Sequence, residues 1–167
     1  MERSLKDLFV DEIKDLYNAE KQITKALPQM AKKASSDELK NAFEEHLKET
    51  ENQIQRLEKV FEELDMAPRS KKCEGIEGII SEGKEMMKEI KDPSLLDAAL
   101  ISAAQKVEHY EIASYGTVRT YAEMLNMHKA ASLLQETLDE ESNANEKLTK
   151  LALNGINQEA LHEIEEE

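Results

Sequence analysis

The stretch LISAAQKVEHYEIASYGTVRTYAEML, residues 100–125, contains a helical stripe that is apolar at both ends and acidic in the middle. Apolar side chains recur every three or four residues on either side of Glu108 and Glu111, which is the spacing of one face of an α-helix. The predicted helix covers residues 93–127, with Asp92 as its N-cap and Pro93 in its first turn. Two glutamates on the apolar face of a helix predict a buried polar site.

Three other segments show the same apolar, polar, apolar order. The predicted helices cover residues 4–33, 36–65 and 129–153. Their polar midpoints are Glu20 in the first, His46 with Glu49 in the second, and the adjacent pair Glu140 and Glu141 in the last. A short helix over residues 76–90 is predicted in the connection between the second and third long helices, and an acidic tail over residues 156–167.

The chain also resembles itself. Residues 5–62 align on residues 96–153 without gaps, and this alignment pairs Glu20 with Glu111 and Glu49 with Glu140. Two related helical hairpins joined by a long connection predict one all-α domain over residues 1–167, a four-helix bundle with a single crossover.

Composition excludes several classes of protein. The 167 residues include 36 Asp and Glu against 22 Lys and Arg, so the formal charge is −14. This balance argues against nucleic-acid and anionic-membrane partners, which attract basic patches. Only 5 Gly and 3 Pro argue against a many-stranded β fold, and the single cysteine, Cys73, excludes an intrachain disulfide framework. No apolar run approaches a membrane span, and a signal-peptide core is absent, so we expect a cytoplasmic protein.

Antiparallel packing of the four helices would bring their polar midpoints to one level of the bundle. The candidate metal ligands there are Glu20, His46, Glu49, Glu108, Glu111 and Glu140. Each isolated buried carboxylate costs several kcal/mol or must be protonated, and two divalent cations would remove that penalty. An oxygen-rich donor set with few histidines favours iron, with manganese or zinc as alternatives.

Four segments resemble the YciF-like branch of the ferritin-like superfamily: DEIKDLYNAEKQITKALPQMAKKA (11–34), EEHLKETENQIQRLEKVFEEL (44–64), AAQKVEHYEIASYGTVRTYAEML (103–125) and LLQETLDEES (133–142). The resemblance implies a ferritin-like four-helix bundle, often dimeric, with a di-metal carboxylate site in its core and a link to bacterial stress responses. Asn52 and Asn143 depart from the family pattern. They lie three residues after Glu49 and Glu140, where ferritin-like sites commonly place histidine.

Two functions follow from these expectations. The first is a di-iron protein of oxidase or peroxidase type that binds O₂ or peroxide, forms a homodimer, and takes electrons from a separate donor because no Cys-x-x-Cys pair is present. The alternative is a non-catalytic bundle that acts as a stress-related interaction module; an iron-storage shell ranks below both.

Tyr17 and Tyr115 are candidates to hydrogen-bond a ligating carboxylate, or are ordinary core tyrosines. Cys73 is expected at the surface, near lysines that would lower its thiol pKa.

Overall fold

The computed structural model describes residues 2–161, and every regular element within that range is helical. The elements are α1 (Leu5–Lys33), α2 (Asp37–Glu63), α3 (Glu74–Glu89), α4 (Pro93–Met124), α5 (His128–Leu151), a wide π turn (Ala152–Ile156) and α6 (Asn157–Glu159). The expected all-α class is confirmed. The last part of the predicted acidic tail, residues 162–167, lies outside the described residues.

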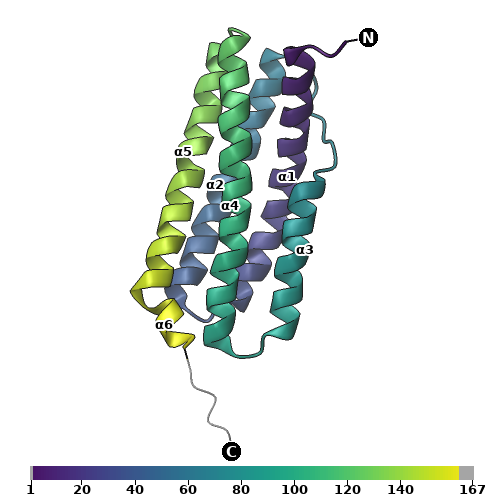
Figure 1. Cartoon of the computed structure of the whole chain (residues 1–167). Helices are drawn as coiled ribbons and strands as arrows, with labels where there is room; N and C mark the ends of the chain where they lie inside the picture. The colour runs from purple at the N-terminus through teal and green to yellow at the C-terminus, as the bar shows by residue number, and fades with distance from the viewer. Residues whose placement is uncertain (1, 162–167) are drawn as a thin grey trace, which may run out of the picture.

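Helices α1, α2, α4 and α5 form the bundle, and α3 lies against its outside, beside α1 and α4 (Figure 1). The two hairpins, α1–α2 and α4–α5, are joined by the long connection that contains α3, and this connection returns the chain to the opposite end of the bundle (Figure 1). The middles of the four long helices therefore lie at the same height of the bundle.

The helix starts follow from local side-chain chemistry. Ser4 and Asp7 form a capping box at α1, while Ser36 accepts a hydrogen bond from the Leu39 amide at α2. Asp92 accepts one from the Leu95 amide at the start of α4. These caps satisfy amides that have no partner inside the helix, and they fix where each long stripe begins.

Asp97 joins the two hairpins at one end of the bundle. This aspartate lies in the second turn of α4, is 3% exposed, and accepts hydrogen bonds from the Ser35 amide at 2.8 Å, the Ser35 hydroxyl at 2.6 Å and the Ser36 amide at 2.8 Å. The carboxylate thus holds the turn between α1 and α2 against α4. The apolar residues around it give no sign of this contact in the sequence.

The core consists of two apolar clusters. One contains Phe9, Leu16 and Phe61, and the other contains Ile23, Phe43 and Leu100. Buried polar side chains from all four bundle helices lie in the sequence positions between them: Glu20, His46, Thr50, Gln53, Glu108, Glu111, Thr137 and Glu141.

Pro28 lies inside α1, which continues to Lys33. One local expectation needs correction. Cys73 is fully buried, with its Sγ 3.1 Å from the Tyr110 hydroxyl, and burial raises the pKa of its thiol, whereas neighbouring lysines would have lowered it at the surface. Gly155 adopts a φ of 151°, a conformation that glycine tolerates, and turns the chain after α5. No helix within residues 2–161 is long and apolar enough to cross a bilayer.

Candidate metal centre

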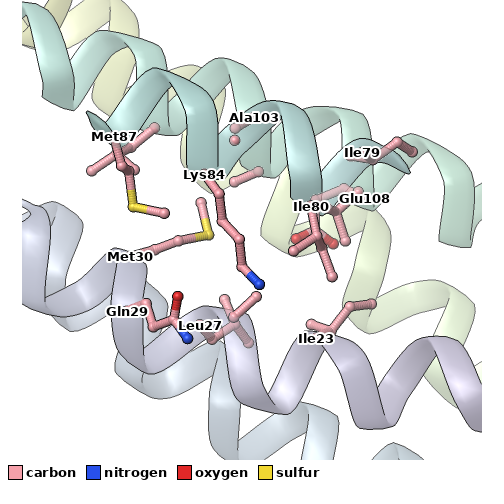
Figure 2. Close-up of a pocket in the computed structure, with 15 residues that line it drawn as sticks. Ile23, Leu27, Gln29, Met30, Ile79, Ile80, Lys84, Met87, Ala103 and Glu108 are labelled. Carbon is pink, nitrogen blue, oxygen red and sulfur yellow. The ribbon is translucent and has the colours of Figure 1, made fainter. Parts of the chain in front are cut away.

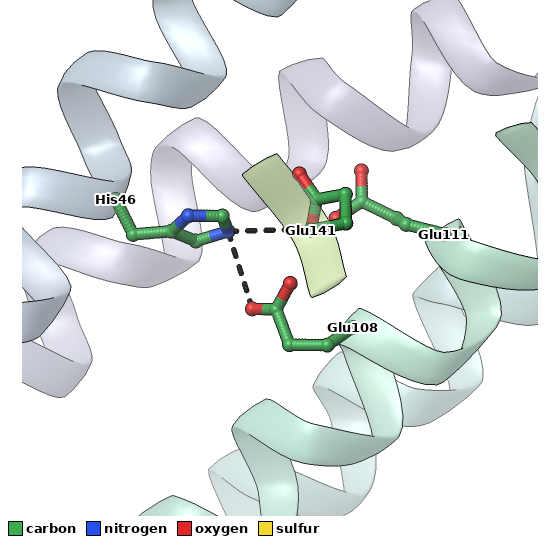
Figure 3. Close-up of side chains that lie close together, drawn as sticks. All are labelled: His46, Glu108, Glu111 and Glu141. Atoms are coloured by element: carbon green, nitrogen blue, oxygen red, sulfur yellow. Dashed lines mark ion pairs between the residues drawn. The ribbon is translucent and has the colours of Figure 1, made fainter. Parts of the chain in front are cut away.

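Four buried side chains from three helices converge at half height of the bundle (Figure 3). They are His46 from α2, Glu108 and Glu111 from α4, and Glu141 from α5, and one ligand atom from each lies within 4.8 Å of the others. Glu108 and Glu111 are three residues apart, so both project from the same face of α4. Glu141 reaches them from α5, which packs against α4, and His46 reaches them from α2 (Figure 3).

The two nitrogens of the His46 imidazole face different carboxylates. Its Nδ1 lies 3.0 Å from Oε2 of Glu49 and therefore pairs with a carboxylate one turn further along α2. Its Nε2 points at the cluster, 3.2 Å from Oε1 of Glu108 and 3.6 Å from Oε2 of Glu141 (Figure 3). A carboxylate on one nitrogen of a histidine fixes the tautomer and directs the other nitrogen toward a metal in many metal sites.

Glu20 from α1 adds a fourth carboxylate beside this group. The side chain is fully buried, and the Tyr115 hydroxyl donates a hydrogen bond of 2.5 Å to its Oε1. Tyr115 is therefore the tyrosine that contacts a predicted ligand. Tyr17 instead donates to Glu58 at 2.9 Å and packs edge-on against Phe61.

The cluster contains more acceptors than the described protein can satisfy. The buried atoms without a hydrogen-bond partner within residues 2–161 include Oε2 of Glu20, Nε2 of His46, Oε2 of Glu108, and both carboxylate oxygens of Glu111 and of Glu141. Unpaired buried polar atoms are rare in proteins, and a concentration of them in one place indicates a missing partner.

Ionisation of the buried carboxyls in the cluster is unfavourable in the protein without a bound cation. Burial, followed by the charges of Glu141 and Glu20, raises the pKa of Glu111 well above its usual range. Burial likewise raises the pKa of Glu141 strongly, and that of Glu20 to about 7. Burial is the largest single influence on Glu108 and opposes its ionisation, but the positive charge of His46 and the hydrogen bonds from Glu141 and His46 together lower the Glu108 pKa. Without cations, some of these carboxyls must therefore hold protons.

The residues fit a divalent metal centre. Four carboxylates and one imidazole supply the donor types that iron and manganese prefer, and a structural zinc site would need more nitrogen or sulfur. Cations would occupy the space between the unpaired oxygens and remove the repulsion that raises the carboxyl pKa values.

The structure does not bring Glu140 to this cluster, although the sequence pattern predicts it there. The Glu140 carboxylate faces the other way and accepts a two-bond fork from Arg56, at 2.8 and 2.6 Å, and a third hydrogen bond from Gln53 at 2.9 Å. Glu141 takes the inward position. One residue turns a helix by about 100°, so the two neighbours point in different directions.

Glu141 is the ligand candidate that the internal repeat misses, because the repeat aligns Glu140 with Glu49. A different signal identifies it: Leu134, Glu141 and Leu148 are spaced by seven residues, and all three are buried. The internal repeat aligns the two hairpins, but it does not pair Glu141 with another acidic residue, because the equivalent position in the first hairpin is Thr50.

The remaining candidates lie around the cluster rather than in it. The Glu49 side chain is 44% exposed and contacts the histidine, not the carboxylates. Asn52 and Asn143 are exposed, and so is His109, the residue after Glu108 in α4.

A pocket of about 90 Å³, with both apolar and charged lining residues, reaches the cluster from the side of α2 and α5. His46, Glu49 and Glu108 line it together with Asn143, and an ion pair between Glu45 and Lys147 joins the two helices at its edge. Hydrated cations therefore have a polar approach to the buried carboxylates.

Comparisons with known proteins agree on one group. A family model described as "Domain of unknown function (DUF892)" matches residues 4–161. Protein YciF of Escherichia coli K12 is 47% identical over 159 residues, which cover 95% of this chain and 96% of that protein.

Solved structures extend this result. The crystal structure of the E. coli stress protein YciF has a TM-score of 0.90 at 47% identity, covering 94% of this chain and 99% of that one. YcfI from Rhodopseudomonas palustris has a TM-score of 0.87 at 44% identity, covering 88% and 94%. A protein from Xanthomonas campestris pv. campestris shares the fold at 22% identity, with a TM-score of 0.74 and coverage of 94% and 95%.

Proposed function

The chain belongs to the DUF892 family and is a YciF homologue with a ferritin-like fold, and from this and its buried carboxylates we propose that it is a di-metal carboxylate protein of stress defence. The observation that carries the proposal is the group of unpaired buried oxygens on Glu20, Glu108, Glu111 and Glu141 opposite Nε2 of His46. These residues would hold two divalent ions, with iron favoured. Bound iron would supply reactivity toward O₂ or peroxide.

The protein's own residues have distinct tasks in this proposal. Glu108, Glu111 and Glu141 neutralise the ions, and Glu49 holds His46 so that Nε2 faces them. Tyr115 donates to one oxygen of Glu20 and leaves the other for a cation. The two apolar core clusters keep bulk water from the site, which strengthens electrostatic interactions within it.

Two further features belong to the proposal. A separate electron donor would be required, because a single cysteine cannot build a cysteine-ligated iron centre of the rubredoxin type in this chain. We also propose a homodimer, as the family resemblance implies; light scattering would then give twice the chain mass of 19.0 kDa.

Metal analysis tests the central statement. Protein purified without chelator, after growth in iron-supplemented medium, is expected to contain about two ions per chain, and EDTA is expected to lower its melting temperature. Glu111→Gln should lose the metal, and Glu51→Gln, an exposed glutamate on α2, should keep it. Equal metal content in both variants would contradict the site. A wild-type chain that binds no metal would favour the non-catalytic interaction module.

A further inference from the structure

A second pocket reaches the carboxylate cluster from the opposite face of the bundle, between α1, α3 and α4 (Figure 2). Its walls are almost entirely apolar and include Ile23 and Leu27 from α1, Ile80 from α3, and Ala104 from α4. Glu108 also lines the pocket and is buried, whereas the other polar lining residues, Gln29 and Lys84, are exposed. Figure 2 shows Lys84 extending from α3 toward α1.

The size of this pocket limits what it can take. Its volume is about 30 Å³, enough for one or two small molecules and too small for an organic substrate. A water molecule in such a space needs two to four polar partners, and apolar cavities stay dry and bind apolar guests such as xenon. Glu108 is the single buried polar residue in the lining, so water is poorly held here.

Glu108 lines both pockets, so the cluster is approached from two faces, of which only the one between α2 and α5 carries several polar side chains. The face between α2 and α5 carries Glu45, Glu49 and Asn143 and suits hydrated ions or peroxide, which need hydrogen bonds. The pocket under α3 is lined by hydrocarbon groups and methionine sulfur, and it favours an apolar ligand that needs no hydrogen bonds.

We propose that the apolar pocket under α3 is a binding and entry site for dioxygen. This inference rests on the proposed function and deepens it, since it names dioxygen as the oxidant delivered from this face. Dioxygen is apolar and diatomic, so it matches both the lining and the volume. The pocket meets the cluster at Glu108, and Oε2 of this glutamate has no hydrogen-bond partner within residues 2–161.

Xenon tests the pocket without any metal. Xenon-pressurised crystals of the EDTA-treated wild-type chain should show a xenon atom between Ile23, Ile80 and Ala104. Ala26→Phe would fill the pocket from α1, and Lys25→Phe adds the same ring at the neighbouring exposed position. Xenon should be lost in the first variant and kept in the second. Its absence from the wild-type pocket would overturn the proposal, whether or not either variant folds.

Oxidation kinetics test the entry role. After anaerobic loading with Fe(II), Ala26→Phe should bind as much iron as Lys25→Phe but react several-fold more slowly with dissolved dioxygen. Hydrogen peroxide should oxidise both variants at the same rate. Equal rates with dioxygen, or equal slowing with both oxidants, would overturn the proposal. If the wild-type chain binds no iron, the proposed function fails, and the xenon experiment still decides what the pocket holds.

Discussion

Glu140 and Glu141 are adjacent in the chain, yet their carboxylates lie in different environments. Glu140 is 25% exposed at its side chain and pairs with Arg56 at 2.6 Å, while the Glu141 side chain is fully buried and lies 3.6 Å from Nε2 of His46. The guanidinium lowers the pKa of Glu140 against the effect of burial, and burial raises the pKa of Glu141. Glu140 thus has a cationic partner in the protein, whereas neither carboxylate oxygen of Glu141 has a hydrogen-bond partner within residues 2–161.

Metal affinity should therefore separate these two neighbours. Glu141→Gln is expected to weaken binding of Fe(II) or Mn(II) at least tenfold, because one anionic ligand is removed from the cluster. Glu140→Gln is expected to bind as the wild type does. Anaerobic titration calorimetry gives both affinities, and a larger loss in the Glu140 variant would place the site elsewhere.

Loss of a carboxylate from the cluster should weaken metal binding but should make the metal-free protein more stable. Glu111 is completely buried among Glu20, Glu108 and Glu141, and neither of its oxygens has a hydrogen-bond partner within residues 2–161. In the metal-free protein the Glu111 carboxyl must either take up a proton on folding or stay charged without a partner, and Glu111→Gln removes this cost, so it should stabilise that form by about 1–3 kcal/mol at pH 8. Urea unfolding with EDTA measures this, with exposed Glu51→Gln expected to change stability by less than about 0.5 kcal/mol.

The metal-free protein should also become less stable as pH rises. The folded-state pKa of Glu20 is raised from 4.5 to about 7, so its contribution to stability is fully present below pH 4.5 and is lost as pH rises through 7. The raised pKa values of Glu111 and Glu141 extend the loss to higher pH. Metal affinity should instead rise with pH, because the ions displace these protons.

Urea unfolding at pH 5, 6, 7 and 8 in EDTA checks this dependence. Glu20→Gln should flatten the slope between pH 5 and 7. Stability that increases over that interval in the wild type would show that the carboxyls are ionised in the folded protein without metal.

Asp97 is expected to be a major structural residue despite its distance in sequence from the turn it supports. Asp97→Ala leaves two backbone amides and a hydroxyl without their acceptor, so a loss of about 2–4 kcal/mol follows. Asp92→Ala removes a single N-cap bond and should lose about 1 kcal/mol. Thermal unfolding of the two variants compares them, and equal losses would contradict the role of the inter-hairpin contact.

Arg56 should stabilise the fold without affecting metal binding. Its fork to Glu140 is partly buried, so Arg56→Gln should destabilise by about 1.5–3 kcal/mol, and Arg56→Lys should recover only part because a lysine cannot make the two-bond contact. The exposed pair of Arg119 and Glu123 provides the control, where Arg119→Gln should change stability by about 0.5 kcal/mol or less. Calorimetry of metal binding should give wild-type affinity for all three.

Much of the fold is predictable from the sequence because its signals are local. Ser4, Ser36 and Asp92 sit directly before periodic apolar stripes, so helix starts and inward faces can be located from neighbouring residues. The polar midpoints also share a position along each stripe, and this shared position is enough to predict that Glu20, His46, Glu108 and Glu111 lie at one level of the bundle.

The sequence by itself determined the class of fold, the height of the polar level in the bundle and most of the side chains that meet there. Only the tertiary structure decided that Glu141 faces inward, that Glu49 supports His46, and that Cys73 is buried. The physical reason is rotation about the helix axis: at a boundary between apolar and polar faces, adjacent residues differ by about 100°, and the partner across the bundle selects between them. Here that partner is Arg56, 84 residues before Glu140 in the chain: it binds the Glu140 carboxylate, and Glu141 faces the cluster.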